Sequence, residues 1–286
     1  MTPAAAAVAF AVALTPAAEL PTKFWGITPD VAEADLPKLK RKADTAVVLV
    51  HGLMPRPIRQ GLAEAADPHA WQKPTGDLVK ALAADADVFG FSYAQTGPVD
   101  SVVLSKGLRD GVAAVKAAGY KEIVLVGHSA GGIVVRRFVE LFPDAGVTKV
   151  VCVAAPHRGS DWARFPDFTL PKTQQRFIRS LLPDVRETQA KGWECTADKC
   201  VQFGVVICKA GRIDGDGVVG VRSQWPDELQ EQGVPAVLVG CNHFDAMKCE
   251  RGVKAITELV QGKVVRWTPE QVEQARKALF GAEKKK

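Results

Sequence analysis

The sequence predicts an α/β protein with a mostly parallel central sheet and helices on both faces. The chain has 286 residues, 47% of them apolar, which is enough to bury the core of one large domain. Short runs of Val, Ile and Leu, such as AVVLV (46–50) and EIVLVG (122–127), alternate with longer helical patterns. Uninterrupted apolar strands between helices are typical of parallel sheets that are covered on both sides.

The expected elements alternate along the chain from residue 46 onward. Strands are expected at 46–50, 87–93, 122–127, 147–155, 201–210 and 235–240. Helices are expected around 75–84, 101–118, 130–142 and 245–261. A last helix begins at TPEQ, where Thr268 can cap, Pro269 suits the first helical position and Gln271 completes a capping box. This pattern predicts one main domain at 19–267, followed by a C-terminal helix and basic tail at 268–286.

The N-terminus resembles a secretory signal peptide over residues 1–18. An apolar stretch at 4–14 is followed by small residues, with a cleavage site expected near Ala17 or Ala18. The stretch is too short to span a bilayer. The protein is therefore expected to be secreted or periplasmic. Because no Lys or Arg precedes the apolar run, the alternative is an Ala-rich tail on a cytoplasmic protein.

The charge pattern argues against nucleic acid as a partner. The formal net charge is +5, and Lys284, Lys285 and Lys286 supply three of these charges in a C-terminal tail. The remaining body is nearly neutral and shows no basic patch interleaved with aromatic residues. Nothing beyond the N-terminal stretch resembles a membrane span, so a transmembrane segment is not expected.

Six cysteines fit an exported protein, in which an even number can pair. Two local pairs are geometrically reasonable, Cys195 with Cys200 and Cys241 with Cys249. Neither spacing is a zinc signature. For Cys152 and Cys208 we expect burial as small apolar residues in strands. No phosphate-binding loop, dinucleotide fingerprint or metal cluster appears, so no cofactor is expected.

The stretch VLVGHSAGG (124–132) carries the strongest chemical signal. It places Ser129 between Gly127 and Gly131, where a buried strand joins an amphipathic helix. A nucleophile elbow needs this context, because a sharp strand-to-helix turn exposes the serine while the glycines avoid collisions across it. The alternative is a Gly-rich turn selected only for tight packing.

Five segments in order resemble the α/β-hydrolase superfamily, and particularly its bacterial lipase and esterase branch, over about residues 45–260. They are VVLVHGL (47–53), VGHSAGG (126–132), AAPHRGS (154–160), DGDGVV (214–219) and NHF (242–244). The resemblance implies a serine hydrolase that cleaves carboxylic esters, of lipids or other acyl groups, without a cofactor. An acyltransferase on the same scaffold and a catalytically silent binding protein are the alternatives.

A serine hydroxyl needs a base, and the base needs an orienting carboxylate. Only His157 and His243 follow Ser129 among the five histidines. The resemblance places the base at His243, just after the last expected strand. It places the acid at Asp216, which precedes a small residue and an aliphatic pair, with Asp214 as the alternative.

The resemblance also assigns the oxyanion hole to the backbone amides of Leu53 and Ala130. His51 and His128 are expected to position their loops by hydrogen bonding rather than to carry protons. The loop at 53–71 is a candidate lining for an acyl pocket, with Leu53, Met54 and Trp71 as apolar contacts.

Residues 160–200 form an insertion between two core strands, where relatives carry a lid or cap. Within it, QQRFIRSLL places Phe177, Ile178, Leu181 and Leu182 on one helical face. This stripe would either close over the site and meet lipid or pack statically against the core.

Overall fold

The computed structural model describes residues 19–32, 39, 41–54, 62–164, 172–190 and 201–281. The expected signal peptide at 1–18 lies outside the described residues. So do the last five residues of the chain, which include the three lysines of the basic tail, and the pair Cys195 and Cys200.

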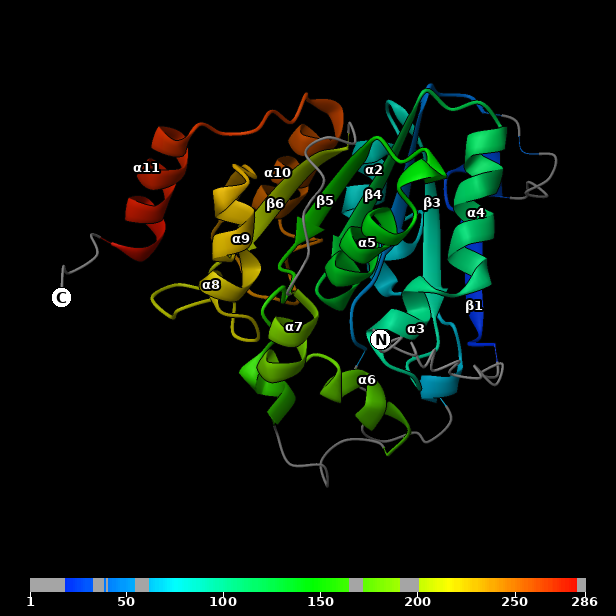
Figure 1. Cartoon of the computed structure of the whole chain (residues 1–286). Coiled ribbons are helices and arrows are strands. Elements are labelled where there is room, and N and C mark those ends of the chain that lie inside the picture. The colour runs from blue at the N-terminus through cyan, green and yellow to red at the C-terminus, as the bar shows by residue number, and fades with distance from the viewer. Residues whose placement is uncertain are drawn as a thin grey trace, which may run out of the picture.

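In the described part of the chain, one seven-stranded sheet occupies the centre of the molecule (Figure 1). Its spatial order is β1-β3-β2-β4-β5-β6-β7. The strands are β1 (Thr22–Gly26), β2 (Thr45–Val50), β3 (Ala86–Tyr93), β4 (Glu122–His128), β5 (Lys149–Val153), β6 (Gln202–Cys208) and β7 (Ala236–Val239). Among them, β1 runs antiparallel to β3, and every other pairing is parallel. The predicted fold class is confirmed.

Helices cover both faces of this sheet (Figure 1). One face carries α3 (Val99–Val103), α4 (Lys106–Ala117) and α5 (Ala130–Leu141), and the other carries α2 (Asp77–Leu82) and α10 (Glu250–Gln261). Successive side chains of β2 enter different cores: Val48 and Val50 join the cluster on one face, whereas Val47 and Leu49 join the cluster on the other. Since both faces are buried, the strands lack the polar alternation of a half-exposed sheet.

The remaining helices are short or peripheral. They are α1 (Pro29–Ala32), α6 (Gln175–Arg179), α7 (Pro183–Ala190), α8 (Val221–Gln224), α9 (Asp227–Glu231) and α11 (Pro269–Phe280). The predicted capping box of α11 is confirmed: Thr268 Oγ1 accepts from Gln271 N, and Gln271 Oε1 accepts from Thr268 N. No helix in the described ranges is long and apolar enough to cross a membrane.

The structure contains α1, α8 and α9, for which no helix was expected, and it differs from the expected elements in further places. The helix expected at 101–118 is divided into α3 and α4, with Ser105 as the N-cap of α4. The helix expected from residue 245 begins at Glu250, after a series of turns. Strand β1 was not expected; it pairs only at the sheet edge, where five residues carry a weak pattern.

The described part of the insertion, 172–190, packs against the core. The side chains of Phe177, Ile178 and Leu181 are buried in the cluster that also holds α5. The Phe177 ring lies 5.9 Å from that of Tyr93, between ring centroids. The stripe packs against the core in this arrangement, and its role as a lid stays a prediction.

Candidate active site

The turn between β4 and α5 holds Ser129 in a strained backbone conformation. Its φ is 54° and its ψ is −126°, a combination that costs a non-glycine residue free energy. The turn closes tightly because a Cβ on Gly127 would lie 2.3 Å from Gly131 O, and one on Gly131 would lie 2.3 Å from Val50 O. Both glycines are therefore required sterically, and Ser129 stands at the N-terminus of α5.

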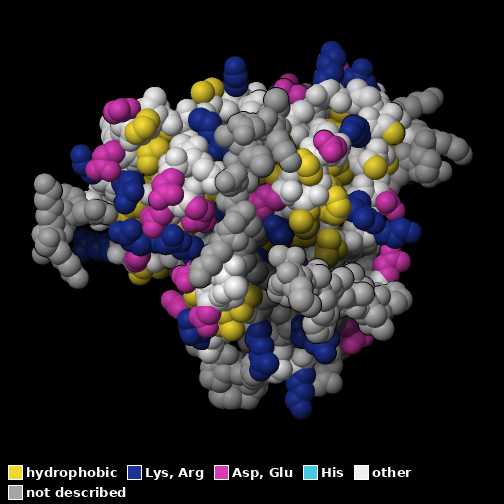
Figure 2. Space-filling model, viewed as in Figure 1, with side chains coloured by type: hydrophobic (Ala, Val, Ile, Leu, Met, Phe, Trp, Pro, Cys, Tyr) yellow, Lys and Arg dark blue, Asp and Glu magenta, His cyan; other side chains and the backbone are white. Residues whose placement is uncertain are grey.

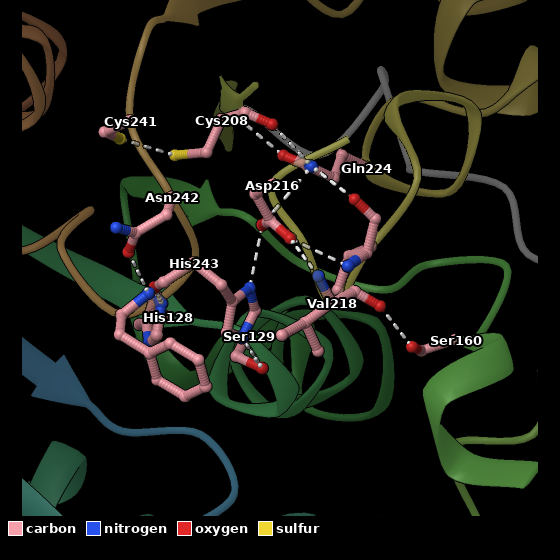
Figure 3. Close-up of polar contacts among 12 residues, drawn as sticks. His128, Ser129, Ser160, Cys208, Asp216, Val218, Gln224, Cys241, Asn242 and His243 are labelled. Carbon is pink, nitrogen blue, oxygen red and sulfur yellow. Dashed lines mark hydrogen bonds and ion pairs between the residues drawn. The ribbon is translucent and has the colours of Figure 1, made fainter. Parts of the chain in front are cut away.

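Three side chains from separate loops meet at this turn (Figure 3). His243, after β7, places Nε2 2.9 Å from Ser129 Oγ. Asp216, in the loop after β6, places Oδ2 2.7 Å from His243 Nδ1. All three are buried, at 6%, 5% and 1% exposure for Ser129, His243 and Asp216. This chain of hydrogen bonds is the arrangement that activates a serine hydroxyl as a nucleophile.

The second carboxylate oxygen of Asp216 is held by its own loop. Oδ1 accepts from Val218 N at 2.9 Å and from Val219 N at 2.7 Å. Gln224 Nε2 lies 3.4 Å from Oδ2 and also donates to Val219 O. Asp214 is exposed at the same loop and does not reach His243 among the hydrogen bonds of the structure. The structure therefore places Asp216, not Asp214, beside the histidine.

His128 supports the loop that carries His243. Its Nε2 donates to His243 O at 2.9 Å, and the two imidazole rings lie 4.9 Å apart. Burial holds the pKa of His128 well below its usual range, and the nearby His243 lowers that pKa further. A neutral His128 thus positions the loop without competing for the proton. Trp71, expected at the acyl pocket, is buried with its ring edge-on to His128.

The two predicted oxyanion donors are the backbone amides of Leu53, in the loop after β2, and of Ala130, the first residue of α5. A Cβ on Gly52 would lie 2.5 Å from Ser129 Cβ, so the loop after β2 passes directly over the nucleophile. Neither Leu53 N nor Ala130 N donates a hydrogen bond to any part of the chain that the structure describes. Unpaired N–H groups at such a position can stabilise a developing oxyanion.

An apolar pocket opens onto Ser129 Oγ and His243. Its cavity volume is about 40 Å³. It is lined by Leu53, Ser129, Pro156, Ser160, Trp162, Ala163, Ile178, Leu181, Val218, Val219, His243 and Phe244. The inserted segment thus contributes part of the wall, and Phe244, which is 62% exposed, lies at the rim.

The outer surface carries interspersed acidic and basic side chains on the face shown in Figure 2.

Several polar residues of the site carry no sequence signal. Gln224, Gln95, Gln174 and Ser160 reach the site loops from distant parts of the chain. Isolated glutamines belong to no motif, so only the folded chain identifies them. His157, the other histidine after Ser129, is buried near Phe203 and takes no part in the hydrogen bonds around Ser129. No group of residues able to hold a metal ion occurs within the described ranges.

The expected bond between Cys241 and Cys249 is not formed. All four described cysteines are free thiols, and Cys241 Sγ lies 3.5 Å from Cys208 Sγ (Figure 3). The Cys241 thiol also contacts the Cys249 thiol. The Cys249 sulfur in addition accepts from Gly252 N at the start of α10. Cys152 and Cys208 are fully buried, as expected.

Comparisons with solved structures agree with this architecture. The mature lipase of Bacillus licheniformis superposes with a TM-score of 0.62 and 14% identity, covering 83% of this chain and 98% of that one. Phospholipase PlaB from Legionella pneumophila gives 0.57 and 16%, covering 82% of this chain and 62% of that one. A metagenomic carboxyl esterase gives 0.51 and 17%, covering 85% and 77%. At these identities the likeness concerns the fold.

A search among curated proteins gives no match. The family model described as the alpha/beta hydrolase fold matches residues 45–191, a range that includes the loop after β2 and the turn at Ser129. Since this range is more than half of the chain, the protein belongs to the α/β-hydrolase fold family.

Proposed function

We propose that the protein is a serine hydrolase that cleaves carboxylic esters, of lipids or other acyl groups, through an acyl-enzyme on Ser129. The observation that carries the proposal is the chain of short contacts from Ser129 Oγ through His243 to Asp216. Structures of the same fold that are named lipase or esterase agree with it. Secretion, inferred from residues 1–18, belongs to the proposal as well.

In the proposed mechanism each group has one step. His243 Nε2 takes the proton as Ser129 Oγ attacks the ester carbonyl, and Asp216 holds the imidazole in the required tautomer. The amides of Leu53 and Ala130 donate to the oxyanion of the tetrahedral intermediate. His243 then returns the proton to the leaving alcohol, and water releases the acyl group by the same steps in reverse order.

The pocket indicates the chemistry of the substrate. Most of the residues that line the pocket are aliphatic or aromatic. Among these lining residues, in the part of the chain that the structure describes, His243 alone takes part in an ion pair, with Asp216. An apolar acyl chain therefore fits better than a charged one, because a charged group would lose its hydration without a partner.

A fluorophosphonate probe tests the nucleophile. The probe should label Ser129, and Ser129→Ala should abolish labelling and lower kcat for p-nitrophenyl butyrate by about 10³-fold or more. Ser105→Ala is the matched control, because Ser105 is a buried serine at the start of α4, outside the site. A Ser129→Ala protein with full activity would exclude the proposed mechanism.

A further inference from the structure

The peptide unit between Gly52 and Leu53 contains the N–H that we assign to the oxyanion hole. In a trans peptide the carbonyl and the N–H point in opposite directions, and the structure has no cis peptide bond in its described ranges. A hydrogen bond that fixes the direction of the Gly52 carbonyl therefore also fixes the direction of the Leu53 N–H. Gly52 O accepts from Gln95 Nε2 at 2.9 Å and lies 2.7 Å from His51 Nδ1.

Gln95 holds the chain on both sides of Leu53. While its Nε2 donates to Gly52 O, its Oε1 accepts from Met54 N at 3.0 Å. Gln95 is 2% exposed and follows β3, and its own N–H donates to Ala63 O at 2.7 Å. The side-chain amide of Gln95 thus hydrogen-bonds to the backbone on both sides of Leu53, the residue that supplies the proposed oxyanion donor.

Gln174 adds a contact from the inserted segment. This fully buried residue lies in the 3₁₀ turn η7 (Lys172–Gln174), and its Nε2 donates to Met54 O at 2.9 Å and to Gln95 Oε1 at 3.0 Å. Gln95 Oε1 therefore receives two donors. A flipped Gln95 amide would place its NH₂ group against both donors, so Gln174 determines which way the Gln95 amide faces.

We propose that Gln95 and Gln174 are positioning residues for the oxyanion hole, through which the inserted segment holds the Leu53 N–H in its donating orientation. The proposal rests on the proposed function. An oxyanion donor is effective because its direction is set before the charge develops. Loss of either glutamine leaves the Gly52–Leu53 peptide held less firmly, with His51 Nδ1 still beside Gly52 O, which affects the tetrahedral state more than the bound ester.

The variants Gln95→Met and Gln174→Met test this role. Each removes the amide while keeping an unbranched side chain, and each should lower kcat for p-nitrophenyl butyrate about 10- to 100-fold with little change in KM. The affinity for an alkyl trifluoromethyl ketone, which adds to Ser129 as a tetrahedral oxyanion, should fall by the same factor. The pH profile should stay in place, because His243 and Asp216 keep their contacts. The double variant should lose no more kcat than the less active of the two single variants, since both residues act on one loop.

Gln230→Met is the matched control. Gln230 is also a buried glutamine that donates to a backbone carbonyl, Trp225 O at 2.7 Å, but it lies in α9 outside the site. It should lose stability and keep kcat and inhibitor affinity. Where a Met variant fails to fold, Gln95→Leu and Gln174→Leu are the second pair, because Leu keeps most of the side-chain volume and carries neither a donor nor a charge.

Folded variants at either position that keep both kcat and ketone affinity would overturn the positioning role. The role would also be overturned if Gln230→Met lost as much kcat and ketone affinity, for the same fall in melting temperature, as the Gln95 and Gln174 variants do. The losses would then follow stability. A wild-type protein without esterase activity or fluorophosphonate labelling would instead refute the proposed function.

Discussion

At the scale of single residues, Asp216 and Asp214 stand two positions apart but in different environments. Asp216 is 1% exposed, and its carboxylate accepts from two backbone amides and meets His243 at 2.7 Å. Asp214 is exposed to solvent. The same turn therefore contains one carboxylate that can orient an imidazole and one that cannot.

This difference predicts the outcome of two matched substitutions. Asp216→Asn should lower kcat by about 10³- to 10⁴-fold, because an amide at this position favours the wrong tautomer of His243. Asp214→Asn should leave kcat within about 2-fold, since an exposed side chain remote from the base contributes little. Steady-state kinetics on both purified variants measures the ranking, and equal losses would contradict the assignment.

At the scale of secondary-structure elements, a buried lysine joins β5 to the helix that follows the His243 loop. Lys149 opens β5 and is 1% exposed. Its Nζ donates to Val260 O at 2.5 Å and to Gly262 O at 2.7 Å, at the end of α10. These contacts satisfy carbonyls that the helix leaves unpaired, and the ammonium charge complements the negative end of the helix dipole.

Lys149→Met should therefore lower the free energy of unfolding by about 1–3 kcal/mol, because buried carbonyls lose their donors. The matched control is Lys254→Met on the exposed face of α10, where Lys254 lies 4.0 Å from Glu258. That change should stay within about 0.5 kcal/mol. Urea denaturation monitored by circular dichroism measures both, and equal stabilities would show that Lys149 does not cap α10.

At the scale of the whole molecule, two buried histidines link stability to pH. Burial holds the pKa of His128 and of His157 well below the usual value. The guanidinium groups of Arg136 and Arg186 lower the pKa of His157 further. The unfolded chain therefore binds protons at a higher pH than the folded chain does, so each histidine makes the folded state less stable as the pH falls below about 6.5.

The free energy of unfolding should consequently fall between pH 6.5 and 5, by at most about 1.4 kcal/mol per pH unit for each histidine. His157→Gln removes one of these groups, outside the Ser129 site. It should reduce the slope of unfolding free energy against pH by at most about 1.4 kcal/mol per pH unit, which corresponds to one proton. Urea titrations at several pH values provide the measurement. An unchanged slope in His157→Gln would mean that His157 is already protonated in the folded protein.

Local sequence patterns predicted the parallel strands of the sheet, their order along the chain and the turn at Ser129, but not the edge strand β1. Continuous apolar strands and helical periodicity act over a few residues, and the collisions that require Gly127 and Gly131 arise within one turn, so both can be read from neighbouring letters. The capping box at Thr268 is equally local, and the structure confirms it. The catalytic roles of Ser129, His243 and Asp216 remain predictions, although the structure brings the three side chains into contact.

Only the tertiary structure decided the contacts between distant segments. His243 meets Ser129 across 114 positions, and Gln174 reaches Met54 across 120. The choice of Asp216 over Asp214 depended on which carboxylate the loop buries, and Cys241 lies against Cys208 because two strand ends are adjacent in the sheet. Such contacts have no local signature, since they depend on where whole elements pack, and packing is a property of the complete chain.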